Sequence, residues 1–215
     1  TYVFKSSFER KNISYNTVKI NNKDNILQRT LLKYKGASIV YCYTRKEVKR
    51  VCQFLQLLGF SADFYHGGLK SQQRKAKQDK WIEGKTQIMV ATNAFGMGID
   101  KPDVRLVFHY DIPENIENYF QEAGRAGRDL QDSIAVLAFE DNDVEILKER
   151  IEKKHVDPKL IKDIYEKVFQ QNQIAIGAGE GLELDFSILE FSKKYDFEII
   201  DTFNAKLQMA NWNKV

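Results

Sequence analysis

Two arginines spaced three residues apart give the strongest chemical signal in this sequence. Arg125 and Arg128 each follow a glycine in the stretch Gln121-Glu-Ala-Gly-Arg-Ala-Gly-Arg-Asp129. Glycine lets a backbone turn sharply and come close to a ligand, and a guanidinium presents a fork of donors that fits phosphate oxygens. We therefore expect a phosphate-binding loop here, rather than two unrelated surface arginines in a turn.

Such a loop needs elements that position it, and the surrounding sequence predicts alternating strands and helices. A buried strand is expected at Ala37–Tyr43, where β-branched and aromatic residues are concentrated. Thr44 and Glu47 have the spacing of a capping box at the start of a helix, and Gly59 is placed to end that helix. Further strands are expected at 60–65, 87–91, 104–109 and 133–139, and further helices at 71–83 and 114–122, the last with Pro113 in its first turn.

Strands that alternate with helices imply right-handed crossovers and a mostly parallel sheet that is covered on both faces. We therefore assign residues 1–150 to an α/β domain of the doubly wound class. Residues 151–215 are expected to form a small helical module. Helices are predicted at 141–154, 158–171, 186–195 and 198–210, and 177–181 is predicted to be a glycine-rich loop.

Composition excludes several classes of protein. The longest apolar runs are far shorter than the roughly 20 residues that span a bilayer. The polar N-terminal stretch lacks the apolar core of a secretory signal, so we expect a cytoplasmic protein without a membrane partner. Cys42 and Cys52 are the two cysteines, too few for a disulfide framework or a four-thiolate zinc site. Both have apolar neighbours and are expected in the core.

The net charge of +3 conceals an uneven distribution. Residues 1–85 hold 18 Lys and Arg against 6 Asp and Glu, a net +12, whereas residues 86–150 hold 6 against 13, a net −7. A basic N-terminal half is typical of a surface that binds a polyanion. A lysine-rich surface that is merely solvated has the same composition, so charge alone leaves both interpretations open.

The loop with the two arginines resembles motif VI of the RecQ family of helicases, within helicase superfamily 2. Ile39-Val-Tyr-Cys-Tyr-Thr-Arg45 is similar to motif IV of that family, and Val90–Asp103, with its Phe-Gly-Met-Gly-Ile core, is similar to motif V. Tyr65-His-Gly-Gly-Leu69 resembles the family's Tyr-His-Ala-Gly-Leu element. Phe8-Glu-Arg-Lys-Asn-Ile13 resembles the linker between the family's two motor domains, which implies an N-terminal linker over about residues 1–20. The resemblance covers roughly residues 8–150 and implies the second RecA-like domain of a DNA helicase.

This resemblance implies a role in nucleotide binding for several residues. Arg128 would be the arginine finger on the γ-phosphate of ATP, and Arg125 a second phosphate or cleft contact. Gln121 would couple the nucleotide to the closed state of the motor. Gly98 and Asp100, at the end of motif V, would contact the nucleotide, Asp100 at its ribose. An aspartate in a turn can instead bond to nearby backbone.

The resemblance also implies a path for single-stranded DNA. Thr44 and Arg45 would hold a phosphate at a helix N-terminus, where free N–H groups favour an anion. Two alternatives stay open, because Thr44 is also a helix cap and a lone histidine such as His66 is more often a structural donor. The expected DNA contacts are Thr44, Arg45, His66, Gly67, Thr92 and Asn93.

The sequence lacks two parts that a helicase needs. Gly84-Lys-Thr86 imitates the end of a P-loop, but Asp79 stands where the first glycine belongs and a predicted helix precedes it. No Asp-Glu-x-His box for magnesium occurs. We therefore expect ATP with Mg²⁺ to be bound mainly by a first RecA-like domain of a parent chain. This chain alone would neither hydrolyse ATP nor unwind DNA.

The resemblance therefore predicts part of an ATP-dependent 3′–5′ DNA helicase that binds single-stranded and duplex DNA. Its setting would be DNA repair and recombination at a bacterial-type nucleoid. Many RecQ helicases carry a four-cysteine zinc module after the motor, but no cysteine follows Cys52, so no zinc is expected. One alternative is a nucleic-acid binding module without motor activity, which the intact Arg125 and Arg128 disfavour. Another is an RNA helicase domain, but DEAD-box RNA helicases typically have His-Arg in place of Gln121-Glu122.

Overall fold

The computed structural model describes residues 10–96, 99–154, 156–175 and 184–212. The chain forms two compact units, residues 1–147 and residues 148–215. The strands of the described residues all belong to the first unit, and the second unit is helical. Within the described ranges, no helix combines the length and the apolar character needed to cross a membrane.

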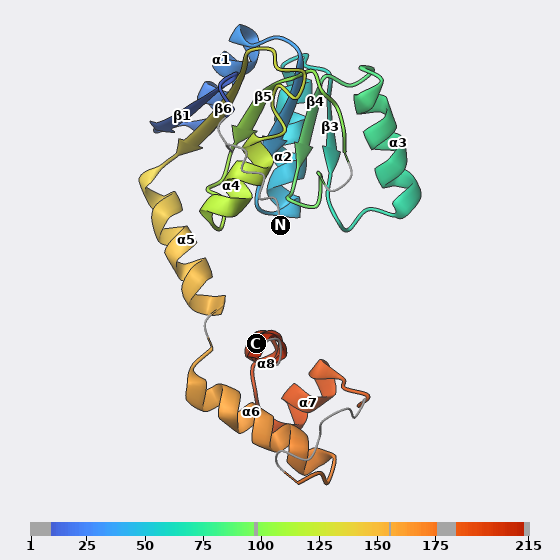
Figure 1. Ribbon diagram of the computed structural model, residues 1–215, viewed down its shortest axis with the longest axis vertical. Helices are drawn as coiled ribbons and strands as arrows, with labels where there is room; N and C mark the ends of the chain where they lie inside the picture. The colour runs from blue at the N-terminus through green and yellow to red at the C-terminus, as the bar shows by residue number, and fades with distance from the viewer. Residues whose placement is uncertain (1–9, 97–98, 155, 176–183, 213–215) are drawn as a thin grey trace, which may run out of the picture. The chain divides into compact units, whose positions relative to one another are not determined.

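Six strands form one sheet in the first unit (Figure 1). Every neighbouring pair is parallel, and the order across the sheet is β1-β6-β5-β2-β4-β3. This is the predicted doubly wound α/β architecture, with one more strand than the five expected. The strands are β1 (Ile13–Lys19), β2 (Ala37–Tyr41), β3 (Ala62–Tyr65), β4 (Ile88–Ala91), β5 (Val104–His109) and β6 (Ser133–Phe139).

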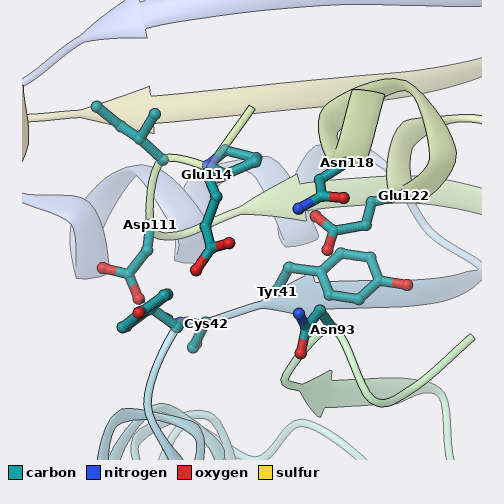
Figure 2. Close-up of a pocket in the computed structure, with 10 residues that line it drawn as sticks. Tyr41, Cys42, Asn93, Asp111, Glu114, Asn118 and Glu122 are labelled. Carbon is teal, nitrogen blue, oxygen red and sulfur yellow. Dashed lines mark hydrogen bonds between the residues drawn. The ribbon is translucent and has the colours of Figure 1, made fainter. Parts of the chain in front are cut away.

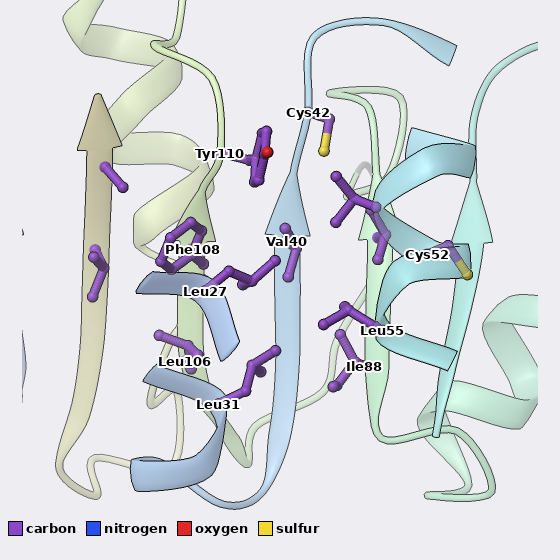
Figure 3. Packing of buried hydrophobic residues seen from close by; sticks show 14 of the residues in the cluster. Leu27, Leu31, Val40, Cys42, Cys52, Leu55, Ile88, Leu106, Phe108 and Tyr110 are labelled. Atoms are coloured by element: carbon purple, nitrogen blue, oxygen red, sulfur yellow. The ribbon is translucent and has the colours of Figure 1, made fainter. Parts of the chain in front are cut away.

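Helices α1 (Lys23–Lys33) and α2 (Arg45–Leu57) cover one face of the sheet. Their apolar side chains pack onto alternate residues of the central strands, as the two-residue period of a strand requires (Figure 3). Cys42 and Cys52 are both buried in this layer as free thiols, which confirms their predicted place in the core. The fully buried members include Leu27, Val40, Val48, Val51, Leu55, Ile88, Val90, Leu106 and Phe108.

Helices α3 (Ser71–Ile82) and α4 (Ile116–Ala123) contribute to the opposite face. Trp81, at the end of α3, is fully buried, and its ring lies edge-on to that of Phe95 with 5.3 Å between centroids. The indole Nε1 donates to the carbonyl oxygen of Ser38 at 3.3 Å. Phe95 lies in the segment after β4, so this packing fixes the segment that resembles motif V against the sheet.

Strand β1 and helix α1 were not predicted, and the expected linker to about residue 20 was too long. Ile13 is the only buried residue of β1, because this strand lies at the sheet edge and pairs only with β6. A strand whose side chains are mostly exposed has no apolar run to reveal it. Helix α1 begins with the Asn22 side chain, which accepts from the N–H of Asn25.

Two predicted helix starts need correction. The Thr44 side chain caps α2, accepting from Glu47 N at 3.0 Å, but the Glu47 carboxylate accepts from Arg50 and does not complete the expected capping box. Helix α4 begins at Ile116 with Asn115 as its cap, two residues after the predicted start near Pro113. An asparagine side chain that accepts a hydrogen bond is a stronger start signal than the proline.

The second unit is built around α6 (Pro158–Gln171), α7 (Ile188–Tyr195) and α8 (Ile199–Trp212). Helix α5 (Asp141–Lys154) precedes them and crosses the boundary between the two units. Inside the second unit, the Ser192 hydroxyl donates to that of Thr202 at 2.9 Å in a buried position. The glycine-rich loop predicted at 177–181 lies outside the described residues. The core consists of Val156, Ile161, Ile164, Phe191 and Ala205.

Candidate functional site

Arg128 lies at the surface, in the turn between α4 and β6. Its Nη1 donates to the carbonyl oxygen of Ile99 at 3.1 Å and to the carboxylate of Asp100 at 3.0 Å. The side chain of Arg128 is 36% exposed and that of Asp100 is 83% exposed. Among the described residues, the guanidinium forms its hydrogen bonds through Nη1 alone. The arginine is thus anchored on one side and accessible on the other.

Arg125 is held differently, although it belongs to the same turn. Its Nη1 donates to the carbonyl oxygen of Gly96 at 2.6 Å, and its Nε is buried without a hydrogen-bond partner in the described part of the chain. Gly96 has φ +147°, and a Cβ on it would overlap the Arg125 guanidinium. Burial raises the pKa of the neighbouring Tyr41, whose hydroxyl donates to Phe95 O. The Arg125 side chain therefore points into the domain, where it holds the turn after α4 against the segment that follows β4.

The neighbouring residues Gln121 and Glu122 face in different directions: Gln121 faces solvent, and Glu122 faces the buried His109. Gln121 is exposed, and its amide donates to Glu117 at 3.1 Å on the same helix. The Glu122 carboxylate lies 3.1 Å from Nε2 of His109, although no ring nitrogen of His109 makes an aligned hydrogen bond within the described ranges. His109 is fully buried between the rings of Tyr41 and Tyr119, at 5.7 and 5.0 Å.

The sequence analysis assigned no role to His109. In the structure this residue, at the end of β5, contacts Tyr119 and Glu122 of α4, the helix that carries Gln121. One signal was available: His109 and Val107 alternate onto the same face of β5, and Val107 packs in the cluster on the α4 side. That face also holds Ala123, the last residue of α4. A polar ring at the end of a buried strand is a candidate for contact with the helix above it.

The residues predicted to contact DNA come together at the carboxyl ends of β2, β3 and β4. Arg45 packs over Gly68, where a Cβ would lie 2.6 Å from Nη1. A Cβ on Gly67 would lie 3.7 Å from Ala94, in the segment that follows β4. Because the three strands are parallel neighbours, the segments that leave them must meet at one edge of the sheet.

Thr92 and Asn93 occupy the middle of this edge. The Thr92 N–H donates to Tyr65 O at 3.2 Å, and its carbonyl accepts from Phe95 N at 2.9 Å. Thr92 is buried, whereas Asn93 is exposed. The backbone of Thr92 is therefore already bonded within the domain, and Asn93 offers its side chain to solvent. Gly98, predicted to contact the nucleotide, lies outside the described residues.

His66 is 5% exposed, and neither ring nitrogen has a hydrogen-bond partner in the described part of the structure. Its ring stacks on Phe64 with 5.7 Å between centroids. Burial lowers the pKa of His66, and the positive charges of Lys49 and Arg45 lower it further. The imidazole is therefore neutral near pH 7, and the positive charge at this edge comes from the lysines and arginines around it.

A small pocket lies at the carboxyl ends of the neighbouring strands β2 and β5 (Figure 2). The connections of these strands run to opposite sides of the sheet, and such a switch point is the usual ligand crevice of this architecture. Its volume of about 60 Å³ is far below the roughly 300–1,000 Å³ of typical small-molecule sites. Its polar lining comes from Tyr41, Asn93, Asp111, Glu114, Asn118 and Glu122.

Residues 22–129, half of the chain, match the family of the helicase conserved C-terminal domain. The ATP-dependent DNA helicase RecQ of Bacillus subtilis is 41% identical over 160 residues, covering 74% of this chain and 27% of that protein. The protein of the same name from Pasteurella multocida is 45% identical over 143 residues, 66% of this chain and 23% of that protein. The chain belongs to the helicase C-terminal domain family, in its RecQ branch.

The fold of this RecQ-type domain is similar to that of solved helicase structures. A DEAD box protein from Methanococcus jannaschii matches with a TM-score of 0.58 and 28% identity, over 64% of this chain and 39% of that protein. The chain spans about a quarter of the length of the RecQ relatives named above. The predicted family is confirmed, as is the RecA-like α/β fold.

Proposed function

We propose that this RecQ-type domain supplies an arginine finger, Arg128, to ATP held by a first RecA-like domain of the same parent chain. The observation that carries this proposal is the position of Arg128, which is anchored through Nη1 to Ile99 and Asp100 while its side chain stays partly exposed. An arginine that stabilises transferring phosphate must reach outward from a fixed base. Arg128 has both properties.

The other motif VI residues support that geometry in different ways. Arg125 holds the turn through the carbonyl oxygen of Gly96, and with its Nε buried it would add a cleft or phosphate contact through Nη2. Gln121 is exposed one turn earlier and would sense the closed state. The Asp100 carboxylate, which accepts from Arg128 here, would accept from the ribose when the nucleotide is bound. ATP with Mg²⁺, when bound, supplies the phosphoanhydride whose cleavage drives the motor.

The same domain would hold one side of a path for single-stranded DNA. Arg45 and Asn93 lie at the edge where three parallel strands end, beside the backbone of Gly67 and Thr92. The capped N-terminus of α2 at Thr44 adds N–H groups that favour a phosphate. The RecQ relatives are named ATP-dependent DNA helicases, which supports DNA as the substrate. Binding of single-stranded and duplex DNA and unwinding in the 3′–5′ direction are proposed for the parent protein.

The chain by itself is proposed to be inactive. Its switch-point pocket of about 60 Å³ is too small for a nucleotide, and the sequence has no P-loop. Both facts support the proposal that the first domain binds most of the nucleotide and that this chain completes the site.

Replacement of Arg128 in the parent protein tests the proposal. Arg128→Ala should lower DNA-stimulated ATP turnover by about 10³-fold or more, because an arginine finger contributes about 10³–10⁵ in rate. Affinity for single-stranded DNA should stay within twofold. Arg29→Ala is the matched control, since Arg29 is exposed on α1, on the other face of the sheet. Turnover in Arg128→Ala equal to that of Arg29→Ala would refute the finger assignment.

A further inference from the structure

The turn that carries Arg125 and Arg128 is gripped by residues from the segment before β1. One guanidinium, that of Arg10, donates to three backbone carbonyls of this turn: Nη2 to Gly127 O at 2.7 Å and to Ala126 O at 3.2 Å, and Nη1 to Gly124 O at 3.4 Å. Arg10 is separated from these residues by more than 110 positions in sequence. A long-range side chain therefore satisfies the carbonyls at the end of α4.

Asn12 adds a second hold on the same turn. Its Nδ2 donates to Gly127 O at 2.7 Å and to Gln131 O at 2.9 Å, while its backbone carbonyl accepts from Ser133 N at 2.9 Å. Gly127 has φ +52°, and a Cβ on it would lie 2.5 Å from the Asn12 amide nitrogen. The close approach of Asn12 is therefore one reason that this position is glycine.

The N–H groups of the turn are satisfied from the other side. Gly127 N donates to Val104 O at 2.8 Å, and Asp129 N donates to Pro102 O at 3.2 Å. The turn is thus fixed between two segments, because its N–H groups donate to Pro102 and to Val104, the first residue of β5, while its carbonyls accept from Arg10 and Asn12. Buried backbone groups are nearly always paired, so removal of one partner forces the peptide planes to turn toward another.

We infer that Arg10 and Asn12 are positioning residues for the arginine finger, an inference that rests on the proposed function. The carbonyls that they bind include those of Gly124 and Gly127, the residues immediately before Arg125 and Arg128. Rotation of these peptides would swing the Arg128 Cα–Cβ bond, and a misplacement of about 1 Å can cost about 10²-fold in rate. The cationic Arg10 also lies at the C-terminus of α4, where a helix favours positive charge.

A purely structural role would leave a different signature. If Arg10 only stabilised the fold, its loss would lower the folded fraction and every activity in proportion. If Arg10 positions the finger, its loss lowers kcat in fully folded protein. DNA binding by the residues at the carboxyl ends of β2, β3 and β4 then stays intact. Loss of Arg10 should also have the larger effect on kcat, because Arg10 donates to three carbonyls and Asn12 donates to two.

The experiment uses the parent protein with Arg10→Met, Arg10→Lys, Asn12→Ala and the control Lys11→Met. Lys11 is the exposed residue between the two, so its replacement should leave kcat within twofold. Arg10→Met should lower kcat about 10- to 100-fold at saturating ATP and DNA in protein that is still folded at the assay temperature, with the Kd for single-stranded DNA nearly unchanged. Arg10→Lys should recover part of the loss, since one ammonium can still reach Gly127 O.

Asn12→Ala provides a second route should Arg10→Met fail to fold, and a fall in kcat of at least fivefold is expected for it. The inference is overturned if both residues can be replaced with kcat within twofold, or if kcat falls only in proportion to the folded fraction. Arg128→Ala, measured in parallel, separates the two levels. Full turnover in Arg128→Ala defeats the proposed function itself, whereas loss there with normal turnover in Arg10→Met defeats only the positioning role.

Discussion

The guanidinium of Arg125 packs against Gly96 so closely that any side chain at residue 96 would overlap it. The same arginine donates to the carbonyl oxygen of Gly96 at 2.6 Å, so the turn after α4 and the segment after β4 are joined at this point. The two motifs that the sequence separates by some thirty residues therefore behave as one structural unit. Gly96 is the residue that permits the contact.

Gly96→Ala should lower the free energy of unfolding by about 1–3 kcal/mol, because alanine is strained at φ +147° and its Cβ would displace the Arg125 guanidinium. Gly59→Ala is the matched control, because Gly59 also has a positive φ of +82° but no atom within 4 Å of an added Cβ. Urea unfolding of the three proteins measures the difference. Addition of Arg125→Ala to Gly96→Ala should recover part of the loss. Equal costs for the two glycines would show that the contact with Arg125 contributes nothing.

Asp100→Asn should change the stability of the chain by less than about 1 kcal/mol, because its ion pair with Arg128 is largely exposed. In the parent protein the same change should raise the KM for ATP several-fold, since Asp100 is proposed to turn between Arg128 and the ribose. Glu83→Gln removes a comparable exposed pair with Lys85 and serves as the control. An unchanged KM in Asp100→Asn would remove Asp100 from the nucleotide site.

The stability of the chain should fall as the pH drops below the ordinary histidine pKa of about 6.5, in part because of His66. Burial holds the pKa of folded His66 lower than this, so the unfolded chain binds more protons in that window. Stability from this residue is therefore complete above the unfolded pKa and declines until the folded pKa is passed. His66→Gln should flatten the difference in unfolding free energy between pH 7.5 and 5.0. His109 is present in both proteins, so its own contribution cancels.

Arg45→Ala in the parent protein should weaken binding to single-stranded DNA and make it less sensitive to salt. Loss of one phosphate contact reduces the slope of log K against log salt by about 0.7. Fluorescence anisotropy titrations at several salt concentrations, with Arg29→Ala as control, measure this slope. If the two variants have the same slope, Arg45 makes no phosphate contact.

The elements whose buried residues recur with a regular period were predicted well from the sequence. Strands β5 and β6 have the predicted bounds, and α2 ends before Gly59 as expected, because apolar alternation and a glycine stop are local signals. Strand β1 was missed because its stability comes from pairing with β6, more than a hundred residues away. Pairing over that distance leaves no mark on the local sequence.

The candidate site shows the same division. The types and spacing of Arg125 and Arg128 predicted a phosphate-binding turn, but nothing local distinguishes the inward arginine from the outward one. That difference arises from Gly96 and Asp100, which only the fold brings near. The grip of Arg10 and Asn12 on the turn was likewise invisible, because backbone carbonyls as partners leave no residue-type pattern.

The rate of the chemical step with ATP and DNA already bound tests the central claim most directly. In a single-turnover experiment on the parent protein, Arg128→Ala should slow hydrolysis of prebound ATP by about 10³-fold or more. Its Kd for ATP should change by only a few-fold, because the first domain is proposed to hold the nucleotide. Hydrolysis in Arg128→Ala at a rate within tenfold of the unmodified protein would contradict the account.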